Sequence, residues 1–170
     1  GVFGLVEAPV ELALPAFRGL PRTRATSDLH CVTQWSRLDN GWEGVPARDV
    51  IALARPLAGA RFATIHCYGG FSTSLDLETL TAGDTLLADR LDDRDLTPDH
   101  GWPVRLVVPS RYAYKSAKWV MGIEITADEE AGFYERRGYH RHGDPWTEER
   151  FWPELDPGFY LTIAVCSDKL

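Results

Sequence analysis

Short strand-like segments outnumber helical ones in this sequence, and the two kinds do not alternate along the chain. Strand character is expected at residues 1–12, 23–33, 61–68, 85–91, 104–108, 119–126 and 155–165. Helical patterns are confined to residues 15–21, 46–57, 77–80 and 129–137. A doubly wound parallel sheet needs a helix after nearly every strand, so the pattern argues against that architecture. It predicts a single compact domain of mixed α+β class.

Turn and motif signals refine this expectation. Asp39-Asn40-Gly41 and Gly69-Gly70 are each typical of a chain reversal. Residues 69–74 resemble a phosphate loop only superficially, because no Lys follows the glycines. The sequence contains no GxGxxG, HExxH or CxxCH motif, which argues against a dinucleotide fold, a zinc protease and an attached haem.

A basic stretch stands out in a chain whose formal net charge is −7. Residues 100–123 contain four cations and no Asp or Glu, namely Arg105, Arg111, Lys115 and Lys118. Two of the three lysines in the chain lie here. A local anion, bound by Arg forks, Lys charges and backbone N–H groups, explains the clustering. The alternative is a solvated loop, since cation clusters on loops are common.

Composition excludes several classes of protein. The excess of acidic over basic residues argues against nucleic-acid binding, which depends on neutralising phosphates. No apolar run is long enough to span a bilayer. No signal peptide is visible, and the sequence opens at Gly1 without Met. We expect a cytoplasmic protein, with the periplasm as the alternative if an export signal precedes this sequence.

The cysteines indicate chemistry rather than a disulfide framework. There are three of them and no CxxC, which suits a reducing compartment. Cys31 follows an extended segment and precedes a polar turn, where a thiolate is well placed as a nucleophile or a soft-metal ligand. The alternative for Cys31 is an inert buried side chain. From their positions alone, Cys67 and Cys166 are expected to serve packing.

Histidines give a weaker signal. His140 and His142 are expected on one side of a strand, but the sequence shows no third ligand at the spacing of a zinc site. His30 and His66 each precede a Cys, which would allow one shared pocket. For each, the alternative is a hydrogen-bonded, partly buried side chain.

Taken together, three stretches resemble one family. HCVTQWSRLDNGWEGVP, HGWPVRLVVPSRYAYKSAKWVMGIEIT and GFYERRGYHRHGDPWTEERF are similar to the molybdopterin domain of the sulfite-oxidase superfamily, with the prokaryotic sulfite-oxidase-like oxidoreductases as the nearest group. The resemblance implies a sulfite-oxidase-type fold and a molybdopterin-binding oxidoreductase domain over residues 1–152. Residues 153–170 match nothing in that family and are expected to form a C-terminal tail.

The resemblance also implies a site. One Cys of the family binds molybdenum directly, and its place here is Cys31, beside a pyranopterin that supplies two further sulfurs. Cofactor contacts are implied for nine more residues: His30, His66, Cys67, His100, Arg105, Lys115, Ser116, Ala117 and Lys118. Binding an anionic substrate requires several arginines, and Arg37 and Arg111 are the candidates. In place of the Arg-rich turn that follows the metal Cys in true sulfite oxidases, this chain has Thr33-Gln34-Trp35-Ser36.

The implied function is an oxidoreductase that uses a molybdenum-molybdopterin cofactor to transfer an oxygen atom on a small sulfur- or nitrogen-containing substrate. With no haem motif in the sequence, electrons would pass to or from a separate electron-transfer protein. The family has a further segment before this domain, which this sequence lacks. The alternatives are therefore a molybdopterin-binding module without catalysis and an anion-binding protein without molybdenum.

Overall fold

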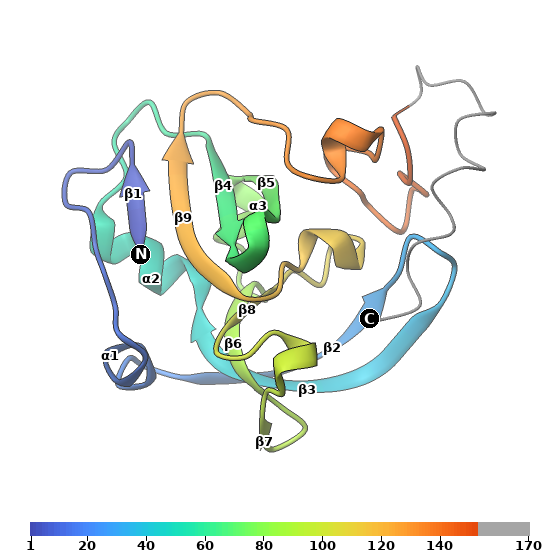
Figure 1. Cartoon of the computed structure of the whole chain (residues 1–170), viewed down its shortest axis with the longest axis horizontal. Helices are drawn as coiled ribbons and strands as arrows, with labels where there is room; N and C mark the ends of the chain where they lie inside the picture. Colours follow the sequence, from blue (N-terminus) through green and yellow to red (C-terminus); the bar gives the residue numbers. More distant parts are fainter. Residues whose placement is uncertain (153–170) are drawn as a thin grey trace.

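A computed structural model describes residues 1–152, and its helical segments are all short (Figure 1). The α-helices are α1 (Leu14–Arg18), α2 (Ala47–Ala54) and α3 (Leu77–Leu80). Single 3-10 turns are η1 (Tyr68–Gly70), η2 (Pro98–His100), η3 (Ala113–Lys115) and η4 (Glu135–Arg137). Among the described residues, no helix has the length and apolar character required to cross a membrane.

Two sheets make up the body of the protein. The first has the order β1 (Val2–Gly4), β9 (Val120–Thr126), β4 (Phe62–Cys67) and β5 (Ser72–Asp76). The second has the order β2 (Thr23–His30), β3 (Ser36–Pro46), β6 (Leu86–Leu91) and β7 (Arg94–Asp95), with β8 (Arg105–Val107) also paired to β6. Only β1 and β9 pair in parallel among these strands; the other pairs are antiparallel. The predicted α+β class is confirmed.

The main hydrophobic core joins the two sheets. Ile65 of β4 and Ile123 of β9 pack in one cluster with Val45 of β3 and Leu87 of β6. Helix α2 adds Ile51 to the same cluster, as its apolar face predicts. The basic stretch, residues 100–123, passes through β8 of the second sheet and enters β9 of the first (Figure 1).

The predicted turn at Asp39-Asn40-Gly41 is wrong, because β3 runs straight through it. The chain reverses earlier, between His30 and Ser36. The Asx-Gly signal instead marks a bulge, where the register with β2 shifts and Asp39 adopts a φ of 54°. Asn40 is 1% exposed and donates from Nδ2 to the carbonyls of Ser27 and Arg37 at 3.0 and 2.9 Å. A buried amide thus satisfies the backbone that the bulge leaves unpaired.

Two further differences from the sequence-based expectations lie around β5. The sequence pattern does not predict β5, which begins at Ser72 directly after the turn at Gly69-Gly70. The helix predicted over residues 129–137 is reduced to η4, because the chain before it lies flat against β5. A Cβ at Gly132 would come within 2.5 Å of the Ser72 carbonyl oxygen, and a helix has no room there. The strand expected at residues 155–165 and Cys166 lie outside the described residues.

Candidate functional site

Cys31 lies at the turn that joins β2 to β3. Its N–H donates to the Trp35 carbonyl at 2.8 Å, and its own carbonyl accepts from Gln34 at 3.1 Å. Gln34 has a φ of 72°, which closes the turn. The Cys31 residue is only 5% exposed, and its Sγ lies 3.0 Å from Thr33 Oγ1. The hairpin thus turns a free thiol toward the interior.

A cluster of aromatic side chains packs against the hairpin that carries this thiol. Tyr112, Tyr114 and Tyr139 are buried in one cluster, against which Val32 of the hairpin packs. Burial raises the pKa of Tyr139, and the neighbouring Tyr134 and Cys31 raise it further, so the Tyr139 hydroxyl stays protonated. Reasoning from sequence missed Tyr139. The only available signal was its place in the stretch GFYERRGYHRH, which carried part of the resemblance.

His30 lies beside Cys31 at the end of β2. Its Nδ1 is 2.7 Å from Ser36 Oγ, and its ring meets the edge of Trp146 with the centroids 4.6 Å apart. Its Nε2 is buried and has no hydrogen-bond partner in the described part of the chain. A buried ring nitrogen without a partner costs free energy, so it suits a ligand that supplies one.

Arg105, the first residue of β8, is a buried cation with no carboxylate partner among residues 1–152. It is 7% exposed, and within that part of the chain its guanidinium donates to the carbonyls of His100 and Ser116, at 3.3 and 3.1 Å. The guanidinium also lies 5.0 Å from the ring centre of Trp42, while Nε has no partner among residues 1–152. Burial lowers the pKa of Arg105 to about 10. An uncompensated buried charge is costly, and an external anion would relieve it.

Lys118 and His100 adjoin Arg105. A Cβ on Gly101 would lie 3.0 Å from Arg105 Cβ and 3.1 Å from Lys118 Cβ, so the two cationic side chains start from one place. Burial and the Arg105 charge lower the pKa of Lys118, whose Nζ donates to the Asp99 carbonyl at 3.0 Å. His100 Nδ1 lies 2.7 Å from Thr97 Oγ1. Arg105 and Lys118, two neighbouring cations without a carboxylate contact among residues 1–152, together form a candidate anion site.

Ser116 and Ala117 belong to the same turn and hold its backbone in place. Ser116 Oγ accepts from the Val108 N–H at 2.9 Å, and the Ala117 carbonyl accepts from Leu106 at 2.8 Å. Both residues are buried. These hydrogen bonds fix the backbone that carries Lys118.

Lys115 has a different setting. Its side chain is fully buried, and its Nζ donates to Glu135 Oε1 at 2.5 Å and to the Ser74 carbonyl at 2.8 Å. Burial lowers the pKa of Lys115, an effect that the Glu135 carboxylate opposes. Glu135 also accepts from Thr73 Oγ1 at 2.8 Å. The pair ties η3 to η4 and β5, so the solvated-loop alternative does not hold for Lys115 or Arg105.

His66 and Cys67 end β4 on opposite faces of its sheet. His66 Nε2 lies 2.8 Å from Glu124 Oε2, and its ring stacks on Phe3 at 5.9 Å. Cys67 packs in the main core, and burial raises the pKa of its thiol to about 12. No contact among residues 1–152 brings either residue to Cys31.

The two arginines predicted to bind an anionic substrate both have partners within the fold. Arg37 Nη2 pairs with Asp92 Oδ2 at 2.5 Å. Arg111 donates to Thr79 Oγ1 at 2.8 Å and to the Ser110 carbonyl at 3.0 Å, and it lines a small cavity of about 70 Å³ with Asp76 and His142. Neither arginine contacts the Cys31 turn within residues 1–152.

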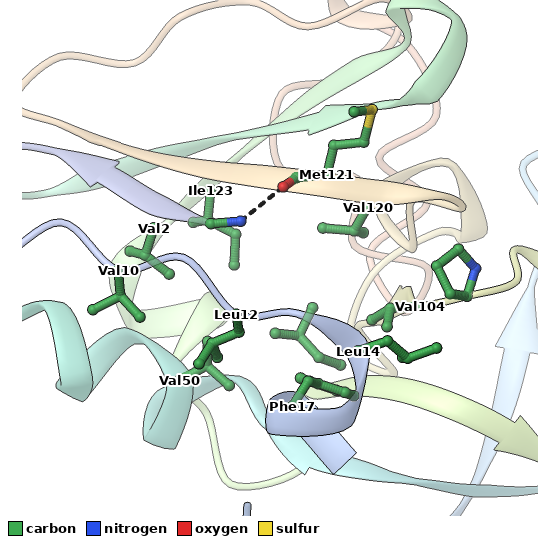
Figure 2. A pocket seen from close by; sticks show the side chains of 13 residues that line it. Val2, Val10, Leu12, Leu14, Phe17, Val50, Val104, Val120, Met121 and Ile123 are labelled. Carbon is green, nitrogen blue, oxygen red and sulfur yellow. Dashed lines mark hydrogen bonds between the residues drawn. The ribbon is translucent and has the colours of Figure 1, made fainter. Parts of the chain in front are cut away.

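A larger hollow of about 140 Å³ opens elsewhere, between α1, β1 and β9. Figure 2 shows aliphatic side chains turned toward one another around it, with the Gly1 amine donating to the Met121 carbonyl at 2.8 Å. Its walls are almost entirely apolar. It offers no nucleophile, acid or metal ligand, so we do not assign the chemistry to it.

The residues around Cys31 and Arg105 fit a molybdenum-pterin cofactor. Residues 1–152 contain no group of three His, Cys, Asp or Glu side chains that could hold a metal. A metal there would have one soft protein ligand, the Cys31 thiolate, and would take its other donors from the cofactor. The unpartnered Nε2 of His30 and Nε of Arg105 are buried polar nitrogens that an organic, phosphate-bearing group could bind.

Comparison with known proteins bears on this site. The family model described as the oxidoreductase molybdopterin binding domain matches residues 1–134. An uncharacterized oxidoreductase, YuiH of Bacillus subtilis, is 44% identical over 150 residues, which are 88% of this chain and 76% of that protein. Sulfite oxidase of Arabidopsis thaliana is 29% identical, over 96% of this chain and 51% of its own length.

A third relative is the protein-methionine-sulfoxide reductase catalytic subunit MsrP of Campylobacter jejuni, 27% identical over 91% of this chain and 59% of its own. Among solved structures, the sulfane dehydrogenase SoxCD of Paracoccus pantotrophus superposes with a TM-score of 0.71 at 22% identity, covering 81% of this chain and 39% of that one. The predicted sulfite-oxidase-type fold is confirmed. The chain spans about half the length of sulfite oxidase.

Proposed function

The chain belongs to the family of oxidoreductase molybdopterin-binding domains, and from this premise we propose that it transfers an oxygen atom to or from a small sulfur- or nitrogen-containing compound. The family implies a molybdenum cofactor. One observation carries the proposal: a buried thiol at a hairpin turn and a buried, uncompensated arginine occur in one domain. The first suits a soft metal and the second suits the acidic end of the cofactor.

Residues of the chain would divide the work of holding the cofactor. When bound, the cofactor supplies a metal that exchanges an oxygen atom and two electrons. Cys31 would ligate that metal, and the Thr33 hydroxyl, 3.0 Å from Sγ, would steady the thiolate. Arg105 and Lys118 would bind the phosphate, over the turn that Ser116 and Ala117 fix. Lys115 already has a carboxylate partner, so we assign it to holding η3 in place.

The surroundings of Cys31 favour a neutral oxide as substrate, such as a sulfoxide or an N-oxide, over an oxyanion. Arg37 is neutralised by Asp92, and Arg150 by Glu148 at 2.6 Å. Tyr139 keeps its proton and is a hydrogen-bond donor suited to an uncharged oxygen. Relatives named for sulfite, nitrate and methionine sulfoxide define the substrates to compare. Electrons would come from or go to a separate redox protein, in the cytoplasm.

The experiment uses protein from a host that makes the cofactor. We expect molybdenum in a one-to-one ratio by elemental analysis, a fluorescent pterin after oxidation, and dye-linked turnover of methionine sulfoxide exceeding that of sulfite or nitrate. Cys31→Ser should keep the fold and the pterin but lose turnover. Full turnover in that variant refutes the ligand assignment. Cofactor without turnover of any substrate indicates a binding module, and neither metal nor pterin indicates a plain anion-binding protein.

A further inference from the structure

Large apolar side chains are exposed around the Cys31 turn. Trp35, Leu38 and Trp146 are 41, 61 and 69% exposed, although each lies on or against the hairpin that buries the thiol. Trp35 belongs to the turn itself, and Trp146 meets the ring of His30. We call these three side chains and their immediate surroundings the hairpin patch. Exposed apolar side chains gathered in one place are typical of an interaction site.

The patch gathers around one cross-strand pair of the hairpin. His30 pairs with Ser36, their side chains are hydrogen-bonded, and Trp146 lies against the His30 ring. Trp35 precedes Ser36, and Leu38 follows Ser36 by two residues, where the bulge of β3 begins. Arg37 lies between Ser36 and Leu38 and pairs with Asp92. The three apolar side chains therefore belong to one short segment of the hairpin and to the loop against it, and the intervening cation is neutralised.

Carboxylates surround this patch. Asp28 Oδ1 accepts from the Asp39 N–H at 2.9 Å, and Asp144 Oδ1 accepts from the Trp146 N–H at 2.7 Å. Asp39 contributes a third carboxylate, and within residues 1–152 none of Asp28, Asp39 and Asp144 forms an ion pair. Their negative charge is thus available to a partner. An apolar centre with a charged rim is the usual composition of a transient protein interface, and the rim charge selects and steers the partner.

The patch also lies directly outside the proposed metal ligand. Residues 33–39 are all exposed, whereas Cys31 is buried behind them. A redox protein must approach the metal closely to exchange electrons with it, and the exposed residues of this hairpin follow the proposed ligand directly in the chain. Weak electron-transfer complexes use small interfaces, which three apolar side chains and a charged rim can supply.

We propose that the hairpin patch is the docking surface for a small redox protein with a basic face. The proposal rests on the proposed function, because only a redox site needs such a partner. The apolar side chains supply contact area, and Asp28, Asp39 and Asp144 select a partner of opposite charge. The chain as a whole, with net charge −7, attracts the same class of partner.

The test uses the cofactor-loaded full chain and cytochrome c as the probe, a small basic haem protein. The rim variant Asp28→Asn, Asp39→Asn, Asp144→Asn keeps each side-chain acceptor oxygen and removes three charges. Its matched control removes three exposed carboxylates elsewhere, through Glu11→Gln, Glu78→Gln and Asp84→Asn. We expect the rim variant to weaken binding at low salt about tenfold and to flatten its salt dependence, with less than about a threefold change in the control.

Leu38→Ser provides a second, charge-independent variant, expected to weaken binding at every salt concentration. Dye-linked turnover should be unchanged in the rim variant and in Leu38→Ser. Equal losses in the rim variant and its control overturn the proposal, because net charge alone would explain them. A change in the oligomeric mass of the protein caused by either patch variant also overturns it, in favour of a second copy as the occupant.

Failure of the two proposals can be told apart. If dye-linked turnover is present and patch variants bind cytochrome c as tightly as the unaltered protein, the docking proposal fails and the enzymatic one stands. If molybdenum and turnover are both missing, the enzymatic proposal fails, and the docking proposal, which depends on it, fails with it.

Discussion

Arg105 and Lys115 are both buried cations from one basic stretch, yet their surroundings differ. Lys115 is bound to the Glu135 carboxylate and joins three segments of the fold. Arg105 is held by two backbone carbonyls and an aromatic ring, with no carboxylate contact described. A buried cation can therefore be stabilised in two ways. An internal counter-ion makes the cation part of the folded structure, whereas a cation without one remains available to bind an anionic ligand.

Removing the internal counter-ion should have the largest effect. Glu135→Gln leaves the Lys115 ammonium buried without a carboxylate, and we expect the free energy of unfolding to fall by about 3–5 kcal/mol. Urea unfolding of the cofactor-free protein measures this loss. The double variant Lys115→Met, Glu135→Gln removes both charges and should recover most of the stability. A loss under about 1 kcal/mol in the single variant would show that the pair is solvated.

The same experiment on Arg105 should give the opposite pattern. Arg105→Met removes an uncompensated charge, so the cofactor-free protein should be equally or more stable toward urea. Its pterin content, measured by fluorescence after oxidation, should fall by about tenfold or more because a charged hydrogen-bonding partner is lost. A variant that keeps its pterin but loses stability would make Arg105 a structural residue like Lys115.

Lys118 sharpens the comparison because it is only partly buried. Lys118→Gln should reduce pterin content by about two- to fivefold, less than Arg105→Met, since a partly solvated charge is screened by water and salt. Raising the ionic strength should shrink the difference between Lys118→Gln and the unaltered protein. If salt has no influence, the role of Lys118 is packing rather than charge.

Raising the pH into the alkaline range should change stability and anion affinity less than any of these substitutions. Burial and the Arg105 charge lower the pKa of Lys118, so the unfolded chain binds more protons than the folded one above that pKa. The free energy of unfolding of the cofactor-free protein should therefore rise with pH in this range, while its affinity for inorganic phosphate falls. Lys118→Arg keeps the charge to higher pH and should flatten both trends. Parallel trends in the two proteins would assign them to another group.

Much of the fold could be predicted from local patterns. The strands at residues 62–67, 86–91 and 120–126 and the helix near residues 47–54 follow from alternation and helical periodicity. The bulge at Asp39 could not be predicted, because an Asx-Gly signal is the same in a turn and in a bulge. Neither could the lost helix before η4, since Gly132 lies against a strand remote in sequence.

In the candidate site, too, some features could be predicted from the sequence and others could not. Cys31, Arg105 and Lys118 were predicted from residue type, spacing and resemblance, and the structure places Cys31 at a hairpin turn, Arg105 at the start of β8 and Lys118 beside Arg105. The setting of Lys115 was not predicted, because Glu135 lies outside the acid-free stretch and meets it only in the fold. Tyr139 was missed for the same reason: its proximity to Cys31 comes from packing across the molecule.

The sequence by itself determined the family, the α+β class, the thiol and the basic stretch, because these depend on residue type and on order along the chain. The tertiary structure alone decided which cation has a carboxylate and which has none, and which apolar side chains remain exposed beside the thiol. These outcomes depend on distances between segments far apart in sequence, and burial turns small differences in distance into large differences in electrostatic free energy.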